Sequence, residues 1–267
     1  MPRQGKICSR KNIYLFFFCH GLPKNFSCML FFAVIKFFYQ GICPQKGLVF
    51  VYTIQSLLDL EHTLAKTYLE GFTYAWEALK GIKDMICALG AQLGDEYTEL
   101  SDSVWVHKTA KIAPTAYLGA PCIIGPETEV RHCAFIRGSA LVGAGCVVGN
   151  SVELKNVILF DNVQVPHYNY VGDSILGYKS HMGAGSITSN VKSDKTLVTI
   201  HTEPPIETGI KKVGAILGDY VEVGCNSVLN PGTVIGRHSN VYPTSCVRGV
   251  IPANSIYKTG GKIAAKR

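Results

Sequence analysis

The stretch Val106–Leu154, VHKTAKIAPTAYLGAPCIIGPETEVRHCAFIRGSALVGAGCVVGNSVEL, repeats with a period of six residues. Nine consecutive hexads begin with an aliphatic residue: Val106, Ile112, Leu118, Ile124, Val130, Ile136, Val142, Val148 and Leu154. A small or β-branched residue follows each of the first eight by four positions: Ala110, Ala116, Cys122, Thr128, Ala134, Ala140, Cys146 and Val152. A second array keeps the same period at Leu217, Val223, Leu229, Ile235, Val241 and Val247.

A period of six fits neither an α-helix, at 3.6 residues per turn, nor an alternating strand, at two. It is typical of hexapeptide repeats, in which each hexad forms one short strand and one turn of a parallel β-helix. The aliphatic and small side chains point into the prism, and three hexads complete a coil. The left hand of this prism is assigned by resemblance to hexapeptide-repeat proteins, since the usual crossover rule would give the right hand. The sequence predicts a mainly β fold, with a left-handed β-helix over 101–267.

Between the two arrays the register slips, and aliphatic residues fall at Leu159, Val165, Val171, Leu176 and Met182. The segment 189–212 then departs from the repeat altogether. It is rich in charge and contains Pro204-Pro205. We expect it to be a loop or short hairpin inserted into the prism.

Residues 51–100 precede the repeat and have a different pattern. Apolar residues recur at mostly helical spacing over Val51–Gly71 and again over Thr73–Gly90, and each segment ends at glycine. This predicts a small α-helical hairpin. Such a hairpin is too small to fold alone, so we expect its apolar face to pack on the following domain.

The first 50 residues contain seven Lys and Arg, no Asp or Glu, and nine of the twelve Phe. The apolar runs Ile13–Phe18 and Met29–Tyr39 are shorter than the ~20 residues of a membrane span. Three interpretations stay open. This basic, Phe-rich extension is a non-native product of a wrongly assigned start codon, a poorly packed or disordered native tail or membrane-surface segment, or a genuine anchor or signal.

The remainder of the chain carries 19 basic and 19 acidic residues. This balance gives no basic footprint for nucleic acid, and we expect neither a nucleic-acid nor a membrane partner. Six cysteines lie outside the extension, and none forms a C-x-x-C motif. We interpret them as small buried thiols in a reducing cytoplasm.

Four segments within Arg137–Asn190 suggest a relationship: RGSA from Arg137, VGNSVELK ending at Lys155, HYNYVGD from His167, and MGAGSITSN ending at Asn190. In order and spacing they resemble the acetyltransferase domain of the bacterial bifunctional glucosamine-1-phosphate acetyltransferase and N-acetylglucosamine-1-phosphate uridyltransferase. The chain is also similar to stand-alone hexapeptide proteins labelled as UDP-N-acetylglucosamine pyrophosphorylase-related. It contains no Gly-rich nucleotidyltransferase loop, so we do not expect nucleotidyltransferase activity.

The resemblance implies roles for particular residues. His167 corresponds to the family's general base, and Arg137, Lys155 and Tyr170 correspond to positions that hold the sugar phosphate. Ala184 and Asn190 correspond to positions near the acetyl donor and the amine. The chain departs from the family at His181, where the relatives have Asn, and after Asn190, where Val-Lys-Ser replaces Tyr-Asp-Gly. The departures fall on the acceptor side.

The residue types agree with acyl transfer from a thioester to an amine. An imidazole can take the proton of the attacking amine, and Arg and Lys suit a phosphate. The glycines of Gly183-Ala184-Gly185 let backbone amides approach the thioester carbonyl, and Lys192 and Lys195 are candidates for the phosphates of coenzyme A. Each feature also has a plainer interpretation. His167 is then a satisfied loop residue, Arg137 and Lys155 are solvated, and the glycines only form a turn.

We therefore predict a cytoplasmic homotrimer that transfers an acyl group from acetyl-CoA to the amine of an amino-sugar phosphate or sugar nucleotide, with active sites between subunits. No metal is expected, because no two of the eight histidines have the H-x-x-x-x-H spacing of metal-binding hexapeptide proteins. His181 and Asn190 join the predicted substrate site. Two alternatives remain: a non-catalytic module that binds sugar nucleotides or regulates a partner, and acylation of an oxygen nucleophile.

Overall fold

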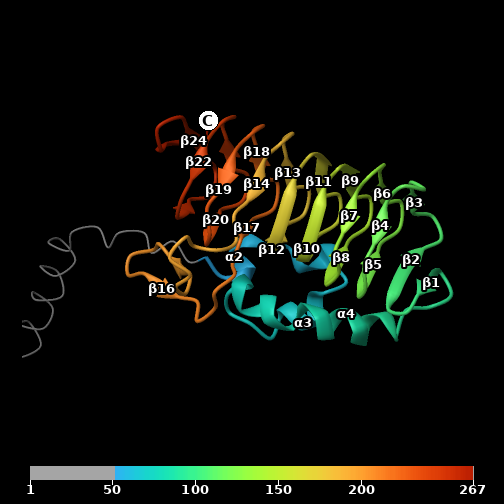
Figure 1. Cartoon of the computed structure of the whole chain (residues 1–267). Helices are drawn as coiled ribbons and strands as arrows, with labels where there is room; N and C mark the ends of the chain where they lie inside the picture. The colour runs from blue at the N-terminus through green and yellow to red at the C-terminus, as the bar shows by residue number, and fades with distance from the viewer. Residues whose placement is uncertain (1–51, 267) are drawn as a thin grey trace, which may run out of the picture. The chain divides into compact units, whose positions relative to one another are not determined.

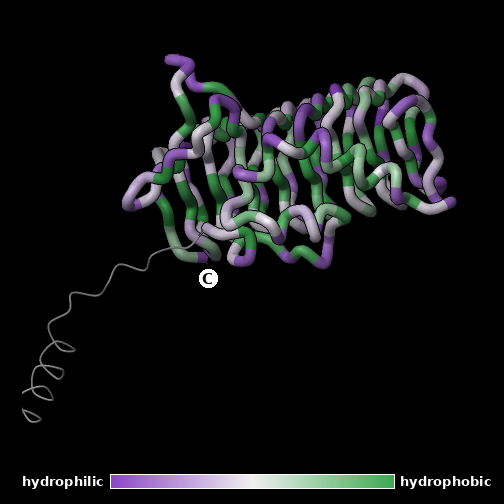
Figure 2. The backbone as a smooth tube through the Cα atoms, turned by 90° about the horizontal axis from the view of Figure 1, so that it is seen from below, coloured by the Kyte–Doolittle hydropathy of each residue, from purple (hydrophilic) through white to green (hydrophobic). Residues whose placement is uncertain are grey.

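The computed structural model describes residues 52–266, and these form a left-handed parallel β-helix with a short helical segment along one side (Figure 1). The predicted extension 1–50 lies outside the described residues, so its three interpretations stay open. In Figure 2, hydrophobic residues recur from coil to coil along the prism. This recurrence is expected because the aliphatic residues of successive hexads stack on one another in the prism.

The prism has three faces, each a ladder of short parallel strands. Face 1 contains β2 (Val104–His107), β5 (Cys122–Ile124), β8 (Ala140–Val142), the second halves of β10 (Glu153–Leu159) and β12 (Tyr170–Leu176), β17 (Ala215–Leu217), β20 (Thr233–Ile235) and β23 (Val250–Ile251). Face 2 contains β3 (Lys111–Ile112), β6 (Glu129–Val130), β9 (Val147–Asn150), β11 (Gln164–His167), β13 (His181–Met182), β18 (Glu222–Val223), β21 (Asn240–Val241) and β24 (Ser255–Lys258).

Face 3 contains β4 (Tyr117–Leu118), β7 (Phe135–Ile136), the first halves of β10 and β12, β14 (Ile187–Thr188), β19 (Val228–Leu229) and β22 (Cys246–Val247). Two antiparallel strands close the ends. One is β1 (Tyr97–Ser101), which pairs with β2, and the other is β25 (Lys262–Ala265), which pairs with β24. All but the last residue of the first of these strands lies within the segment 51–100 that was predicted to be helical.

The register slip seen in the sequence has a structural cause, which is two coils shortened by one residue. Strand pairing joins Cys122 to Ala140, 18 residues apart, but Ala140 to Val157 and Val157 to Ser174, 17 apart. Both missing residues belong to the corner between face 3 and face 1. There β10 and β12 run around the corner unbroken, with Asn156 and Asp173 in the left-handed backbone region.

The insertion at 189–212 leaves and returns at this same corner. It contains a two-stranded antiparallel hairpin of β15 (Thr199–Ile200) and β16 (Ile206–Glu207). An isolated bridge between Val191 and Lys212 closes its base. The coils before and after the insertion pair directly, with Ile187 opposite Val228.

The prediction of two helices before the prism was only partly right. The segment contains α2 (Ile54–Leu57), η1 (Leu60–His62), α3 (Lys66–Leu69), η2 (Ala75–Gly81) and α4 (Ile82–Gly90), so the expected helix over Val51–Gly71 is three short pieces. Polar side chains lie at both breaks: the Asp59 carboxylate accepts from the Glu61 amide and the Thr63 hydroxyl accepts from the Ala65 amide, and each begins a new turn. The hairpin of two continuous helices is therefore not formed.

The helical segment covers face 1, where α4 contacts β5, β8 and β10 and η2 contacts β12 (Figure 1). The outward side chains of this face are consequently fully buried, including Ile123, Leu141, Ile158 and Ile175. The contact is close at Gly90, where an added Cβ would lie 2.3 Å from the Trp105 ring. One prism face is thus removed from solvent within the chain itself. Within residues 52–266, no helix has the length and apolar character that crossing a membrane requires.

Candidate functional site

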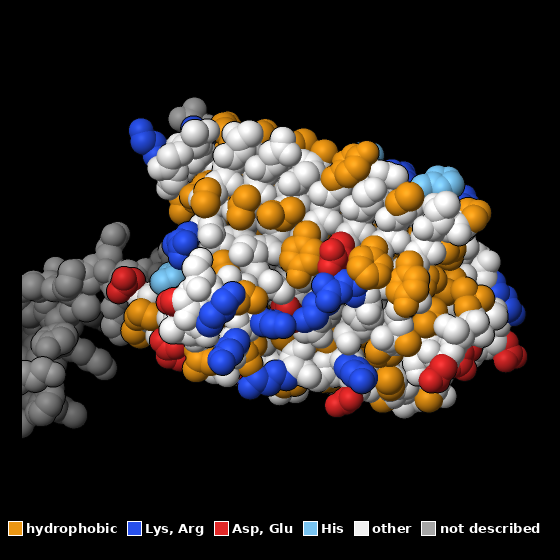
Figure 3. All heavy atoms as spheres, viewed as in Figure 1, with side chains coloured by type: hydrophobic (Ala, Val, Ile, Leu, Met, Phe, Trp, Pro, Cys, Tyr) orange, Lys and Arg blue, Asp and Glu red, His pale blue; other side chains and the backbone are white. Residues whose placement is uncertain are grey.

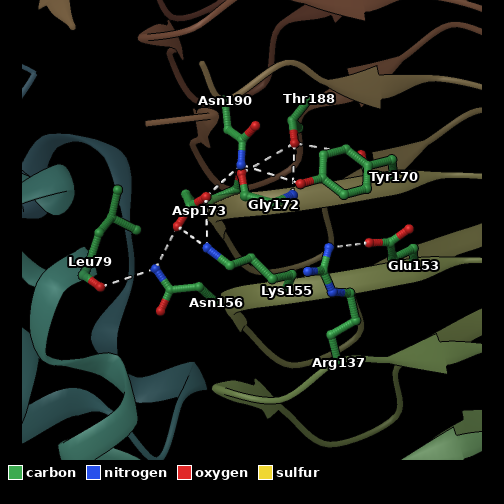
Figure 4. Close-up of polar contacts among 11 residues, drawn as sticks. Leu79, Arg137, Glu153, Lys155, Asn156, Tyr170, Gly172, Asp173, Thr188 and Asn190 are labelled. Atoms are coloured by element: carbon green, nitrogen blue, oxygen red, sulfur yellow. Dashed lines mark hydrogen bonds and ion pairs between the residues drawn. The ribbon is translucent and has the colours of Figure 1, made fainter. Parts of the chain in front are cut away.

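The corner between face 3 and face 1 carries a cluster of polar side chains from successive coils (Figure 4). At its centre is Asp173, whose side chain is 5% exposed. The Lys155 Nζ atom lies 2.9 and 3.2 Å from the two carboxylate oxygens of Asp173. The shortened corners produce this arrangement, because Lys155 and Gly172 are register partners in β10 and β12.

Two amides complete the shell around the Asp173 carboxylate. The Nδ2 atom of Asn156 donates to Asp173 at 2.9 Å and also to the Leu79 carbonyl oxygen at 3.1 Å, which ties the corner to η2. The Nδ2 atom of Asn190 donates to Asp173 and to the Tyr170 hydroxyl, at 3.2 Å from the latter. The cluster therefore joins three coils and the helical segment.

Arg137 and Tyr170 extend the cluster onto face 3. Arg137 donates from Nη1 to Glu153 Oε1 at 2.8 Å, and its remaining guanidinium N–H groups have no hydrogen-bond partner among the described residues. Burial, reinforced by the charges of Asp173 and Glu153, raises the pKa of the Tyr170 phenol above its usual value. At neutral pH Tyr170 is therefore a neutral hydroxyl, able both to donate and to accept.

His167 lies at the opposite edge of face 3, where face 2 turns into face 3. Its side chain is exposed, and no described residue hydrogen-bonds its imidazole. The backbone amide of His167 donates to the buried Asn169 side chain at 3.1 Å. Asn169 in turn donates to the carbonyl oxygens of Gly183 and Ser186 in the next coil, at 2.9 and 3.0 Å. The backbone that carries the imidazole is thus held firmly.

Gly183-Ala184-Gly185 stacks directly on the His167 corner. The amide of Gly185 donates to the His167 carbonyl oxygen at 3.0 Å, and the amide of Gly183 donates to Val223 at 2.7 Å. These bonds leave only Ala184, which is partly exposed, with an amide that has no hydrogen-bond partner in residues 52–266. Coil stacking thus uses the N–H groups of both glycines, and Ala184 carries the amide of this step that is left to approach a thioester carbonyl. Gly185 has φ of +70°, which explains its identity.

Three other predicted residues lie apart from the Asp173 cluster. His181 is on face 2, where its Nδ1 atom is 2.9 Å from Glu222 Oε2. Lys192 is in the insertion, and its Nζ atom contacts Thr196 within the same loop. Lys195 is exposed in that loop. One chain therefore brings together Arg137, Lys155, Tyr170 and Asn190, and separately His167 and Ala184.

Three residues of the cluster were not predicted as site residues: Asp173, Asn156 and Glu153. The signal for the first two was present in the slip of the aliphatic register. Aliphatic residues are six apart before the slip, but only five apart from Leu154 to Leu159 and from Val171 to Leu176. A polar residue at a shortened corner is brought closer to its neighbours in the adjacent coils.

The cysteines also differ from expectation. Cys122 and Cys146 are buried, as expected, and burial raises the pKa of each thiol to about 12. Cys133, Cys225 and Cys246 are exposed. The prediction of buried thiols was wrong for these three, because they occupy corners or outward strand positions rather than the prism interior.

The chain is similar to two bifunctional proteins over much of its own length. "Bifunctional protein GlmU" from Methanococcus vannielii is 30% identical over 159 residues, 59% of this chain and 34% of that protein. "Bifunctional protein GlmU" from Trichormus variabilis is 31% identical over 216 residues, 76% of this chain and 39% of that protein. The chain therefore spans between a third and two fifths of the length of these relatives.

Among solved structures, a hexapeptide transferase family protein from Anaplasma phagocytophilum has 15% identity and a TM-score of 0.35, over 61% of this chain and 78% of that one. PerB from Caulobacter crescentus, solved with CoA and GDP-perosamine, has 18% identity and a TM-score of 0.23, over 60% of this chain and 56% of that one. The sequence profile of the GMPPB C-terminal domain matches residues 121–258, more than half of the chain. These residues contain both edges of face 3 with their polar clusters, and the chain belongs to the GMPPB C-terminal domain family, whose hexapeptide-repeat prism resembles the GlmU acetyltransferase domain.

Proposed function

We propose that this chain is an acyltransferase that moves an acetyl group from acetyl-CoA to the amine of an amino-sugar phosphate or sugar nucleotide. The observation that carries the proposal is the pairing of His167 with Ala184. His167 presents an exposed imidazole with no competing hydrogen bond in the described chain, and its carbonyl oxygen accepts from Gly185, so the unused Ala184 amide belongs to the coil stacked directly on His167. A base next to an amide N–H is what thioester aminolysis requires.

In the proposed reaction, the amine nitrogen forms a bond to the thioester carbonyl carbon, and the Nε2 or Nδ1 atom of His167 takes the ammonium proton. The Ala184 N–H donates to the developing oxyanion. The C–S bond then breaks, and coenzyme A leaves as the thiolate, which receives the proton. The products are the N-acetylated acceptor and free coenzyme A.

Arg137 and Lys155 are the proposed phosphate ligands. The Arg137 side chain is 47% exposed and uses one nitrogen for Glu153, which leaves further donors of its planar fork for a phosphate. Lys155 is held in place by Asp173, so its ammonium is already oriented before a substrate arrives. A groove of about 430 Å³ on face 2 ends at Asn150, the register partner of His167, and is our proposed channel for the acyl donor.

We also propose that the active form is a homotrimer in the cytoplasm, with face 3 buried between subunits. Face 3 has an exposed aromatic row, with Tyr117 60% and Phe135 43% exposed. Both polar clusters border this face. A neighbouring chain packed there would enclose the substrate between the edges of two prisms.

The proposal is tested by acetyl transfer, followed as thiol release from acetyl-CoA with glucosamine-1-phosphate and with nucleotide-linked amino sugars. His167→Ala is expected to lower kcat by about 10²- to 10⁴-fold, the usual contribution of a general base. The matched control is His238→Ala, because His238 is exposed at the corner between face 1 and face 2 and lines neither the proposed donor groove nor the Asp173 cluster. Equal turnover in both variants would reject His167 as the base.

One observation favours a second candidate function, a non-catalytic module that binds sugar nucleotides. A catalytic imidazole is usually oriented by a third group, and the described chain offers none to His167. A stable protein that binds a nucleotide sugar but neither binds coenzyme A nor releases thiol would support this module. Thiol release that depends on a hydroxyl acceptor would instead support O-acylation.

A further inference from the structure

A cavity of about 430 Å³ lies where the helical segment, the prism corner and the inserted segment meet. Its lining includes Leu79 and Lys80 from η2, Lys155 and Asp173 from the corner, and Ile210, Lys211 and Lys212 from the returning end of the insertion. Figure 3 shows lysine and arginine side chains gathered over this part of the surface, below a row of aromatic rings. The cavity thus adjoins the Asp173 cluster but is built largely from parts outside the repeat.

The charge of this cavity is strongly one-sided. Four lysines line it, and the only acidic lining residue is Asp173, which is already paired with Lys155. In the described part of the chain, no acidic side chain pairs with Lys80, Lys211 or Lys212. Three uncompensated cations therefore converge in a protein whose residues 51–267 are formally neutral. Like charges repel one another, so their convergence from separate segments indicates an anionic ligand.

The number of cations exceeds what one phosphate needs. Arg137 and Lys155 supply two positive groups at the proposed phosphate position, which match a sugar monophosphate. Lys80, Lys211 and Lys212 add three more in the cavity that Lys155 also lines, where a second phosphate could bind next to the first. Leu79 and Ile210 offer apolar contact in the same cavity, which a nucleobase or ribose can use and a free phosphate cannot.

We propose that this cavity binds the diphosphate of a nucleoside diphosphate, and that the acceptor is therefore an amino sugar linked to a nucleotide. The identity of the acceptor rests on the proposed acyl-transfer function. Binding of a nucleoside diphosphate in the cavity does not depend on that function. The N-terminal helices and the insertion then have a shared role. They supply the cations that distinguish a nucleotide-linked sugar from a sugar monophosphate.

The test is calorimetric titration of the full chain with UDP, GDP, inorganic pyrophosphate, glucosamine-1-phosphate and coenzyme A. The Lys211→Ala/Lys212→Ala double variant is expected to weaken nucleoside diphosphate binding about tenfold or more, because charge-assisted bonds to phosphate are lost. Its binding should also become less dependent on salt. The matched control is Lys108→Ala/Lys262→Ala, which removes the same charge from exposed positions outside the helical segment and the insertion and is expected to change binding less than twofold.

Several outcomes would overturn the inference. One is unchanged nucleoside diphosphate binding in the double variant. Another is weaker binding of coenzyme A with unchanged binding of UDP and GDP. This result would indicate that the cavity holds the diphosphate of the acyl donor. Failure of the acyl-transfer function is distinguishable, since it appears as absent thiol release while lysine-dependent nucleotide binding persists. In the converse outcome, the double variant acetylates glucosamine-1-phosphate as fast as the wild type, and neither protein binds a nucleotide. The acyltransferase proposal would then stand, and a nucleotide-linked acceptor would be rejected.

Discussion

At the scale of single residues, the candidate site depends on one buried carboxylate. Asp173 accepts hydrogen bonds from Lys155, Asn156 and Asn190, and the residue as a whole is only 3% exposed. Removal of its charge would leave these donors, one of them cationic, without their common acceptor. Buried groups left in this way are more costly than exposed ones, because water cannot replace the lost partner.

We expect Asp173→Asn to lower the free energy of unfolding by about 2 kcal/mol, measured by urea denaturation. The substitution should also weaken acceptor binding, since Lys155 loses its orientation. Glu153→Gln is the matched control. Its partner Arg137 is exposed, so the expected loss of stability is smaller than that for Asp173→Asn. A smaller loss for Asp173→Asn than for Glu153→Gln would contradict the central role of Asp173.

The cysteines give a chemical test of side-chain placement. The thiolate is the reactive form, and burial raises the pKa of Cys122 and Cys146 to about 12. We expect iodoacetamide at pH 8 to label Cys133, Cys225 and Cys246 first, and Cys122 and Cys146 only after unfolding. Peptide mapping by mass spectrometry resolves the sites. Labelling of Cys146 in the native protein as fast as that of Cys133 would contradict the assignment.

Residue-level prediction succeeded where a hexad fixed which way a side chain points. If the aliphatic hexad residues from Ile124 to Leu154 pointed outward, the prism interior would have no side chains to fill it. The structure buries all of them. Corners lack this constraint, since the repeat does not require a particular kind of side chain there. The sequence therefore indicated Arg137, Lys155, Tyr170 and Asn190 through resemblance, whereas Asp173 emerged only once the shortened coils were visible.

At the scale of elements, a second buried carboxylate fastens the helical segment to the prism. Asp219 is 1% exposed and accepts from the backbone amides of Asp59 and Tyr178 at 2.8 and 2.9 Å and from the Arg237 guanidinium. Arg237 also donates to the Leu57 carbonyl oxygen at 3.1 Å. These bonds hold the start of the segment over face 1.

We expect Asp219→Ala to cost about 2 to 4 kcal/mol of stability and to speed amide hydrogen exchange first in residues 54–62. Exchange in the central coils should change less, because the effect is local to the clamp. Glu61→Ala serves as the control, since Glu61 forms an ion pair only with Lys66 at the surface of the described chain. Uniform acceleration across the chain would argue against a local clamp.

Helical elements were predicted less well than strands for a physical reason. Apolar spacing reports which side chains face the core, and several short turns laid along a ladder of strands satisfy it as well as one long helix does. Polar side chains at Asp59 and Thr63 lie at the two breaks. Ser, Thr and Asp act both as caps and as ordinary surface residues, so the pattern alone did not choose between the two.

At the scale of the whole molecule, the three faces have different surroundings. Face 1 is covered by the helical segment, and face 2 presents mostly polar side chains such as Lys111, Gln164 and Glu222. Face 3 exposes aromatic rings, with Tyr117 and Phe135 5.5 Å apart between centroids. A hydrophobic surface left on one face of three is typical of an interface.

We expect Phe135→Glu combined with Tyr117→Glu to convert the proposed trimer to monomers, because buried charge on each contacting face opposes association. Light scattering coupled to size-exclusion chromatography measures the mass. Gln164→Glu on face 2 is the control and should leave the mass unchanged. A wild-type chain that is monomeric at all concentrations would reject the interface.

The prism itself was the part of the molecule that the sequence predicted best. Fifteen aliphatic residues in two arrays share one period. A single repeating geometry turns all of them inward, so local spacing specified the global shape. The covering of face 1 and the contact of the insertion with the corner depend on residues far apart in sequence. No periodicity reports on such contacts, and for them only the folded chain is informative.

The insertion at 189–212 leaves the ladder and rejoins it without disturbing the pairing of Ile187 with Val228. In evolutionary terms, this corner is a site at which residues can be inserted, deleted or exchanged while the scaffold keeps its register. A family built on this prism can therefore acquire new ligands by changing one appended segment, independently of the coils that carry its chemistry. For protein engineering, the same corner is the natural position at which to graft a foreign loop.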